Sequence, residues 1–336
     1  MKGYKVSSAG TLDLVDMPSV VGESQVKIKV NKAGLSREDV LSLHKTQTSN
    51  FVISRQCVGM VVETGSSVSM LERGNRVLIS PYIPCNICNE CKTGNYGLCQ
   101  DLKVAGKNTD GYLRDFVISD VNNLFLLPEN VSDNQAIFVE HTAKALAIMS
   151  KLNVEKGKHI VIVGASIVGL ILAQLAIYYQ AVPILVDGRQ SHLDMANKLG
   201  IYYTINYVSA EPYKKVEAIT GGTLSENLVL LGSGNFSLHN SIRFLMTGGN
   251  VVIADVENYK DNDSNAVQAI ANNQLSLNGV SNGLKFYMPA INLLANKTVL
   301  VSQFVSKEIK FDQVEQNLQY MSNNPYEHIK VIVNNN

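Results

Sequence analysis

The residues with the clearest chemistry are four cysteines in one short stretch, PCNICNECKTGNYGLC (84–99), of a chain that holds five. Their spacing is C-x2-C-x2-C-x7-C, and they are Cys85, Cys88, Cys91 and Cys99. The N-terminus lacks the continuous apolar segment of a secretory signal, so we expect a cytoplasmic protein whose thiols stay reduced. Thiols this close together then suit a metal better than disulfides, and the pattern favours zinc. A redox-active cluster or a chance grouping is the alternative.

A glycine-rich turn is the second motif. The apolar segment HIVIV runs into a G-x-G-x-x-G pattern with serine in the middle place, and a helical pattern follows. The turn consists of Gly164, Ala165, Ser166, Ile167, Val168 and Gly169. The first glycine permits the tight bend, the middle one normally lets a pyrophosphate approach, and the last lets helix and strand pack closely. Ser166 adds a side chain where phosphate would come, although its hydroxyl can donate to it. The motif predicts dinucleotide binding; a glycine turn without that role is the alternative.

An acidic residue follows the turn at the spacing that a dinucleotide site uses. The next apolar segment, ILVD, ends at Asp187, about twenty residues beyond the turn. A carboxylate there can accept hydrogen bonds from both ribose hydroxyls and repels a 2′-phosphate. Asp187 therefore favours NAD, while Arg189, two residues later, keeps NADP possible.

The elements that position these motifs change along the chain. Residues 25–125 contain short strand-like segments separated by Gly, Ser and Asn, which indicates an irregular β domain. A helical pattern covers 132–152, with Ser132 or Asp133 as its cap. Beyond it strands alternate with helical stretches, which is typical of a parallel, doubly wound sheet. The tail from residue 284 to 336 has a helical and then an extended pattern. The predicted fold class is α/β.

Length and charge limit the remaining possibilities. A chain of 336 residues is long enough for two domains. Its 29 basic residues balance its 29 acidic ones, and it carries no long run of one sign. It also lacks the ~18 consecutive apolar residues that a membrane span requires. We therefore expect neither nucleic acid nor membrane as a partner.

Together these segments resemble the zinc-containing alcohol dehydrogenase family, the medium-chain dehydrogenase/reductases, along nearly the whole chain. The similar segments are VKIKVNKAGLSREDV, VGMVVETGSSV, GNRVLISPYIPCNICNECKTGNYGLC, DGYLRDFVIS, LPENVSDNQAIFVE, the glycine turn and LGIYYTINY. The resemblance implies a GroES-like domain at 1–144 and 287–336, with a Rossmann domain at 145–286 inserted between them. It implies an oxidoreductase that uses NAD(H), or less favourably NADP(H), on a small-molecule substrate. It also implies a homodimer or homotetramer, paired near LSLNGV.

The resemblance assigns a role to the four cysteines. In this family the lobe at about 84–100 binds a structural zinc, so Cys85, Cys88, Cys91 and Cys99 are implied as ligands of one zinc per chain. The physical chemistry agrees with this assignment. Four thiolates close a tetrahedral shell and leave no position for water or substrate, so such a site stabilises a loop and does not catalyse.

The catalytic zinc of the family is a different matter. Its ligands usually include a Cys in a C-G-[ST]-D-x-H segment and a His in a G-H-E segment. Here these segments read SREDVL (36–41) and RQC (55–57). Ser36 replaces a thiolate with an alcohol, and Gln56 replaces an imidazole with an amide oxygen, a poor ligand for zinc. The resemblance therefore predicts an enzyme that works without the usual catalytic zinc.

A rearranged metal site is the alternative. Glu140 stands where some family members place the third ligand, and Cys57 stands where the family keeps a Glu that can approach the metal. Such a site would combine Cys57, Glu140, Glu38 and His141.

A metal-free reductase still needs an acid, because the nicotinamide supplies only the hydride chemistry. Glu38 stands where the family has a proton-transferring Ser or Thr, and Leu41 where a relay His can sit. Glu38 is the first candidate, since a carboxyl buried beside a nicotinamide would have a raised pKa. Lys144 is the second, one helical turn beyond Glu140. For both, an ordinary ion pair is the alternative, Glu140 with Lys144 in particular.

Three hypotheses follow from these residues. The first is the metal-free oxidoreductase acting on a small alcohol, carbonyl compound or activated alkene, and the second has the rearranged metal. The third is a degenerate paralogue that binds dinucleotide, or nothing, and serves as a regulatory or partner subunit. Arg37 stands where some alcohol dehydrogenases hold an arginine that binds the pyrophosphate, a contact that could offset Ser166.

Overall fold

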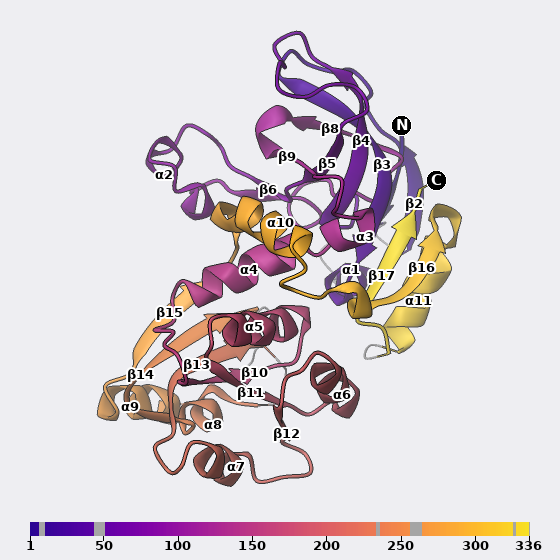
Figure 1. The fold of residues 1–336 in the computed structure, drawn as a ribbon. Helices are drawn as coiled ribbons and strands as arrows, with labels where there is room; N and C mark the ends of the chain where they lie inside the picture. Colours follow the sequence, from indigo (N-terminus) through magenta and orange to yellow (C-terminus); the bar gives the residue numbers. More distant parts are fainter. Residues whose placement is uncertain (7–10, 44–50, 233–235, 256–263, 325–326, 336) are drawn as a thin grey trace. The chain divides into compact units, whose positions relative to one another are not determined.

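The computed structural model describes residues 1–336 except 7–10, 44–50, 233–235, 256–263, 325–326 and 336 (Figure 1). The described chain divides into two compact units. The first contains Met1–Glu140, Tyr287–Asn296 and Val301–Asn336, and the second contains His141–Phe286 and Lys297–Leu300.

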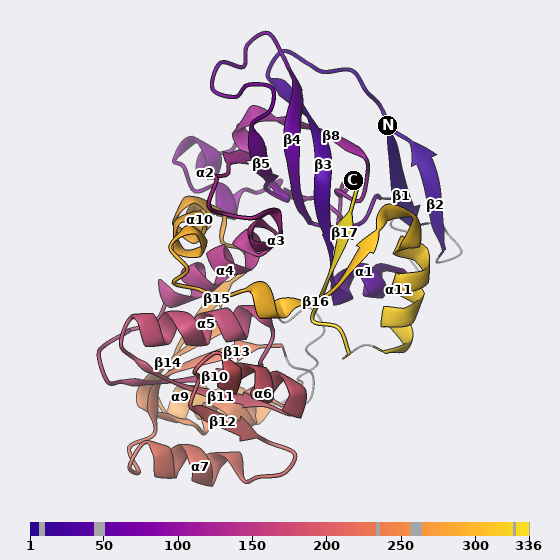
Figure 2. The same ribbon diagram turned by 45° about the vertical axis from the view of Figure 1, so that its right-hand side comes forward.

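A seven-stranded sheet forms the centre of the first unit (Figure 2). Its strands are β3 (Gln25–Leu35), β4 (Gln56–Thr64), β5 (Arg76–Ile79), β8 (Phe116–Asp120), β9 (Leu124–Leu126), β16 (Val305–Lys310) and β17 (Lys330–Asn334). Their order is β16-β17-β3-β4-β5-β9, with β8 also paired to β3, and only β16 and β17 run parallel. The last strand of the chain therefore lies directly beside β3.

Alternation along β3 explains why this segment forms a strand. Val26, Ile28 and Val30 are fully buried, while the residues between them are not. A period of two places these valines and isoleucine on one face, where they join the main apolar core of the unit.

Smaller elements complete the first unit. Two strand pairs stand apart from the sheet: β1 (Lys2–Val6) with β2 (Leu12–Asp16), and β6 (Tyr82–Ile83) with β7 (Lys103–Val104). Its helices are α1 (Arg37–Leu43), α2 (Asn89–Lys92), α3 (Asp133–Ala136), α10 (Tyr287–Ala295) and α11 (Val314–Asn323). The boundary between the units falls within α4 (Val139–Met149).

The helix expected at 132–152 is in fact two helices. Ser132 caps α3, because its side chain accepts a hydrogen bond from the Gln135 backbone N–H in a full capping box. Residues 137 and 138 form a turn between the two helices, in which the Phe138 N–H donates to the Gln135 carbonyl at 3.0 Å, and α4 begins at Val139.

The second unit is a doubly wound sheet, so the predicted fold class is confirmed. Six parallel strands lie in the order β12-β11-β10-β13-β14-β15, the 3-2-1-4-5-6 order of dinucleotide-binding folds. They are β10 (His159–Val163), β11 (Val182–Asp187), β12 (Tyr203–Asn206), β13 (Ser225–Leu231), β14 (Leu245–Ala254) and β15 (Ser276–Val280). The strand predicted at LSLNGV is β15, at one edge of the described sheet.

Helices cover both faces of this sheet. They are α5 (Ile167–Tyr178), α6 (Gln190–Lys198), α7 (Pro212–Ile219), α8 (Leu238–Ile242) and α9 (Ser264–Asn272). Right-handed crossovers put α5 on one face and α7 to α9 on the other, as Figure 1 shows. Ten consecutive residues of α5 are buried, so this helix is covered on all sides.

The segment Lys297–Leu300 returns to the second unit through a side-chain clamp. Gln174 of α5 is buried and accepts a hydrogen bond from the Leu300 N–H at 2.8 Å. Its Nε2 donates to the Leu300 carbonyl at 3.2 Å. A single glutamine thus satisfies both backbone groups of one returning residue.

Candidate functional site

The four cysteines of the 84–99 stretch converge in the structure. Their Sγ atoms all lie within 4.8 Å of one another, and the Cys85 and Cys91 sulfurs are 3.9 Å apart. Four zinc–sulfur bonds of about 2.3 Å in a tetrahedron place the sulfurs about 3.8 Å apart, so this arrangement fits zinc closely. Within the described parts of the chain, no other group of three or more Cys, His, Asp or Glu side chains converges in this way. These four thiols could therefore hold one zinc ion.

Local backbone geometry prepares these thiols to bind a cation. The Cys88 pKa is lowered to about 6, first by backbone N–H groups of Gln100 and Cys91. The Cys85 pKa is lowered for the same reason, by the N–H groups of Ile87 and Cys88. Burial raises the Cys91 pKa to about 12. The backbone N–H groups therefore stabilise the thiolate forms of Cys85 and Cys88. A bound ion would supply the positive charge that keeps Cys91 ionised.

The glycine turn has the backbone that its sequence requires. Gly164 has a φ of +116°, and a Cβ there would lie 2.7 Å from the Leu231 carbonyl oxygen. A Cβ on Gly169 would lie 2.0 Å from the Gly164 carbonyl oxygen. Both positions therefore need glycine, and the turn delivers the N-terminus of α5 to the carboxyl edge of β10, where such folds bind a pyrophosphate.

Ser166 has a structural role in addition to the expected one. It is the N-cap of α5, and its Oγ accepts a hydrogen bond from the Gly169 N–H at 3.3 Å. Its hydroxyl hydrogen remains available for a phosphate oxygen. The serine therefore caps the helix while its side chain narrows the approach to the turn.

Asp187 lies at the end of β11, and its carboxylate already has several donors. It accepts from the Ala165 N–H at 2.6 Å and from the Arg189 N–H at 2.8 Å. The Arg189 guanidinium adds two more bonds, at 2.9 and 2.7 Å. Burial opposes the charged form of Asp187, but these contacts, led by Arg189, leave its pKa below the usual value. A ribose would compete with Arg189 for this carboxylate.

A buried polar chain occupies the place where the family resemblance puts the metal ligands. Lys330 of β17 is fully buried, and its Nζ donates to Gln56 Oε1 at 2.6 Å. The Gln56 Nε2 donates in turn to Glu140 Oε2. The Tyr82 hydroxyl donates to the other Glu140 oxygen at 3.0 Å. A cation and a carboxylate are thus linked through one amide inside the first unit, and we refer to these four residues as the Lys330 network.

Ser36 is bound into a neighbouring cluster. Its Oγ and its N–H both contact Asp39 Oδ2, at 2.8 and 2.7 Å. The other Asp39 oxygen accepts from the Ser54 N–H at 2.8 Å, and Ser54 has the left-handed φ of +72°. Ser36 therefore acts as a hydrogen-bonding alcohol that fixes the start of α1.

The residues of the rearranged metal site proposed from the sequence have different surroundings. Cys57 follows Gln56 on β4, so the two side chains point to opposite faces of the sheet. Gln56 faces Glu140, whereas Cys57 is buried in the apolar core and burial raises its pKa far above the usual range. Among the described residues, Cys57, Glu140 and Glu38 do not converge as the four cysteines do, and the rearranged site stays a hypothesis.

Glu38 and Lys144 have surroundings that differ from those expected. The Glu38 side chain is 46% exposed and lies 3.5 Å from Arg55, so it lacks the burial that its proposed role as an acid assumed. Glu38 lies in the first turn of the short helix α1, where its side chain reaches solvent. Lys144, in the second unit, forms an ion pair with Asp255.

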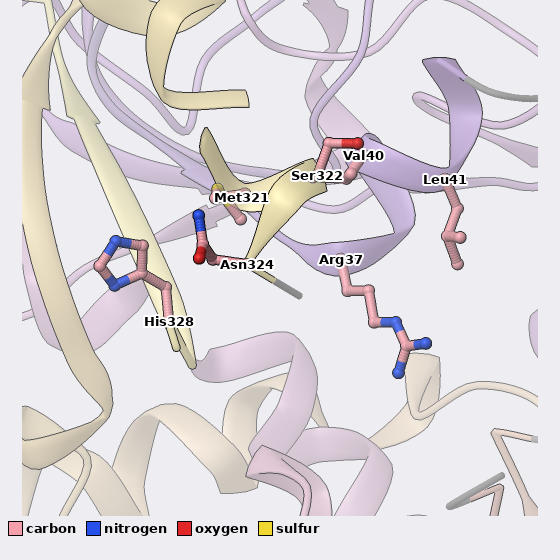
Figure 3. Close-up of a pocket in the computed structure, with 7 residues that line it drawn as sticks. All are labelled: Arg37, Val40, Leu41, Met321, Ser322, Asn324 and His328. Carbon is pink, nitrogen blue, oxygen red and sulfur yellow. The ribbon is translucent and has the colours of Figure 1, made fainter. Parts of the chain in front are cut away.

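Arg37 lines a cavity of about 110 Å³ between α1 and α11 (Figure 3). Figure 3 shows Arg37 and Leu41 extending from α1, with Asn324 and His328 on the opposite side. Among the histidines, His192 is buried and its Nδ1 bonds the Ala165 carbonyl at 2.7 Å, while His44 lies outside the described residues. His192 thus supports the glycine turn.

Sequence reasoning missed Lys330 and Tyr82. Lys330 is 274 positions from Gln56, so no local spacing connects them. One indirect signal exists in Gly34, an isolated glycine inside a strand pattern, which often marks a close approach. A Cβ on Gly34 would lie 2.8 Å from Lys330 Cε.

Comparison with known proteins agrees with this architecture. The alcohol dehydrogenase GroES-like domain matches residues 22–129, and the zinc-binding dehydrogenase domain matches residues 168–296. A zinc-type alcohol dehydrogenase-like protein of Haemophilus influenzae is 27% identical over 92% of this chain and 91% of its own length. Sorbitol dehydrogenase of Bacillus subtilis is 24% identical over 93% of this chain and 91% of its own. A crystal structure from Sinorhizobium meliloti, described as a zinc-binding dehydrogenase bound to NADP, superposes with a TM-score of 0.86, at 23% identity and 99% coverage of both chains.

The chain belongs to the zinc-containing alcohol dehydrogenase family of medium-chain dehydrogenase/reductases. It combines the GroES-like and Rossmann folds of that family, and it is an alcohol dehydrogenase-like oxidoreductase. Within the described residues, no helix is both long and apolar enough to cross a membrane.

Proposed function

We propose that this protein is an NAD(P)(H)-dependent oxidoreductase that interconverts a small alcohol and its carbonyl compound without a catalytic zinc. The Lys330 network carries this proposal. Gln56 directs its carbonyl oxygen at the Lys330 ammonium and its amide nitrogen at Glu140, so a metal cation at that oxygen would meet the charge of the ammonium. A tethered ammonium supplies positive charge where a metal-dependent enzyme would need an ion. One relative is named sorbitol dehydrogenase, after a polyol, and this supports the proposal of a hydroxylated substrate.

Bound nicotinamide would supply the hydride chemistry, and the residues of this chain would orient it. The N-terminus of α5, with Gly164, Ser166 and Gly169, is suited to the pyrophosphate. Asp187 at the end of β11, together with Arg189, would contact the ribose. The four-cysteine lobe would hold one structural zinc, which stabilises that lobe and takes no part in turnover.

Two measurements on the purified protein test this function together. NADH and NADPH oxidation is followed with a panel of small aldehydes, ketones and ketoses, and the reverse reaction with sorbitol and other alcohols. Metal content is determined on the same sample by atomic emission. We expect turnover with one zinc per chain, unchanged by a chelator that leaves the cysteine site loaded. Two zinc ions per chain, with activity lost when one is removed, would contradict the proposal.

A non-catalytic role is the second candidate, and one observation favours it. Asp187 is already satisfied by Arg189 and by the Ala165 N–H, so a dinucleotide gains less there than at an open carboxylate. This alternative predicts dinucleotide binding, or none, with no turnover on any substrate of the panel.

Arg189 should determine the choice between the two cofactors. Replacing Arg189 with alanine frees Asp187 for the ribose hydroxyls and removes the only guanidinium that bonds this carboxylate in the described structure. A charge-assisted hydrogen bond contributes about 1.5–3 kcal/mol, so we expect the ratio of NADPH to NADH dissociation constants to rise about tenfold or more. Fluorescence titration with both cofactors measures it, with Lys198→Ala as the surface control. An unchanged ratio would place Arg189 outside the cofactor site.

We also propose that the protein is a cytoplasmic homodimer, with a homotetramer as the alternative, and that β15 forms the dimer contact. This strand pairs only with β14 in the described sheet, and its Leu277 is 44% exposed. An open strand edge with an exposed leucine is suited to pairing with a second copy. Sedimentation analysis showing a monomer at micromolar concentration would rule this out.

A further inference from the structure

The Lys330 network contains a fully buried cation that the sequence analysis did not assign. Lys330 has no exposed surface, and burial lowers its pKa. Asp39, Glu140 and Glu38 oppose that shift, whereas Arg55 adds to it. A buried lysine is costly unless it is paired, so its retention in the core requires a partner that compensates its charge.

Asp39 and Glu140 are the carboxylates that compensate this charge most, and Glu140 is the one that Lys330 reaches through a chain of hydrogen bonds. The Gln56 amide accepts from Lys330 on one side and donates to Glu140 on the other. Such an arrangement is a polarised chain, because each hydrogen bond orders the next in a low-dielectric interior. Tyr82 completes it by donating to the remaining Glu140 oxygen at 3.0 Å. Burial, followed by Glu140, raises the Tyr82 pKa well above its usual range, so the phenol keeps its proton.

The surrounding backbone is shaped to admit the lysine. Gly34 lies on β3 opposite Ile332 of β17, and the Lys330 side chain passes over it. A Cβ on Gly34 would meet Lys330 Cε at 2.8 Å and Gln56 Oε1 at 3.1 Å. Any side chain at position 34 would thus push the lysine away from its acceptor. This observation is independent of the hydrogen bonds and indicates a built site.

We propose that Lys330 is the internal counter-ion of Glu140: it keeps this carboxylate ionised and thereby holds the Tyr82 hydroxyl as a hydrogen-bond donor to it. For the proposed reaction Lys330 is a positioning residue, since it acts only through Gln56, Glu140 and Tyr82. Only the positioning role of Lys330 rests on the proposed function. The test of the counter-ion proposal does not measure turnover, so this proposal and the proposed function can fail separately.

The test compares Lys330→Met with Glu140→Gln and with the double variant. In Lys330→Met, Glu140 loses the cation to which it is linked and keeps only a share of the Arg55 charge, which Glu38 and Asp39 also use, so the carboxyl should take up a proton at neutral pH. Infrared difference spectra should then show a carboxylic acid C=O band that is absent from the wild type and from the double variant. Lys310→Met, at an exposed position of β16, is the control and should show no band.

Chemical denaturation of the same set gives the second readout. Removing one member of a buried charge pair costs about two to four orders of magnitude in the folding equilibrium constant, whereas neutralising both costs little. We expect Lys330→Met to unfold at the lowest denaturant concentration and the double variant to recover most of the loss. Gly34→Ala should resemble Lys330→Met, because it displaces the lysine.

The outcomes are decisive in each case. A folded Lys330→Met without the acid band would overturn the proposal, and so would additive losses in the double variant. If Lys330→Met does not fold but the double variant does, the counter-ion role is supported. If Glu140→Gln folds and the double variant does not, Lys330 serves packing rather than charge compensation.

Discussion

Replacing Cys91 with serine is expected to release the zinc and to disorder the 84–100 lobe. Cys91 is buried in α2, and its sulfur faces that of Cys85 at 3.9 Å. A serine hydroxyl stays protonated near neutral pH and is a poor zinc ligand, so the tetrahedral shell would lose one corner. The lobe has few other means of support, because its regular structure is one short helix, a 3₁₀ turn and the two-residue strands β6 and β7. Loss of a metal belongs to the mechanisms that cost more than about 4 kcal/mol.

Zinc content and proteolysis measure this effect. We expect one zinc per chain in the wild type, close to none in Cys91→Ser, and new cleavage between residues 84 and 100. Cys57→Ala is the matched control, since it removes the one cysteine outside the cluster while leaving all four ligands in place. A Cys91→Ser protein that keeps its zinc would show that the metal is held elsewhere.

Local motifs explain how much of the site was predictable. The cysteines lie within one short stretch, and the glycine turn within another, so their chemistry follows from spacing alone. The alternation of strands and helices likewise predicted the doubly wound sheet. Each of these features depends on neighbours in sequence.

The Lys330 network was not predictable for the opposite reason. It joins β17 to β4 across 274 positions, and its geometry depends on the pairing of β17 with β3. The same limit applies to Glu38, whose burial the sequence could not decide, and to Cys57, whose direction depends on which face of β4 meets the core. The sequence indicated that the usual metal ligands are replaced, by Gln56 among others. Only the fold shows that the Lys330 ammonium lies beside Gln56.

Replacing Gly169 with valine is expected to abolish dinucleotide binding while leaving the first unit folded. A Cβ at this position would lie 2.0 Å from the Gly164 carbonyl oxygen and 3.1 Å from Leu231 Cδ1, both in the immediate surroundings of the turn. The atom that the new Cβ meets is a backbone oxygen, which cannot rotate away as the end of a flexible side chain can. The turn and the start of α5 must therefore move apart. The N–H groups that would receive the pyrophosphate then lose their common direction, and we expect the NADH dissociation constant to rise at least about a hundredfold, as about 3 kcal/mol of lost contacts implies.

Ala218→Val provides the matched control for this substitution. Ala218 is exposed near the end of α7 in the second unit, so valine should be accommodated there. NADH fluorescence titration gives the affinity, and zinc content reports whether the cysteine lobe of the first unit is intact. Gly169→Val should lose NADH and keep zinc, whereas Ala218→Val should keep both. Equal NADH affinity in the two variants would mean that the glycine turn does not receive the dinucleotide, and the proposed function would lose its cofactor site.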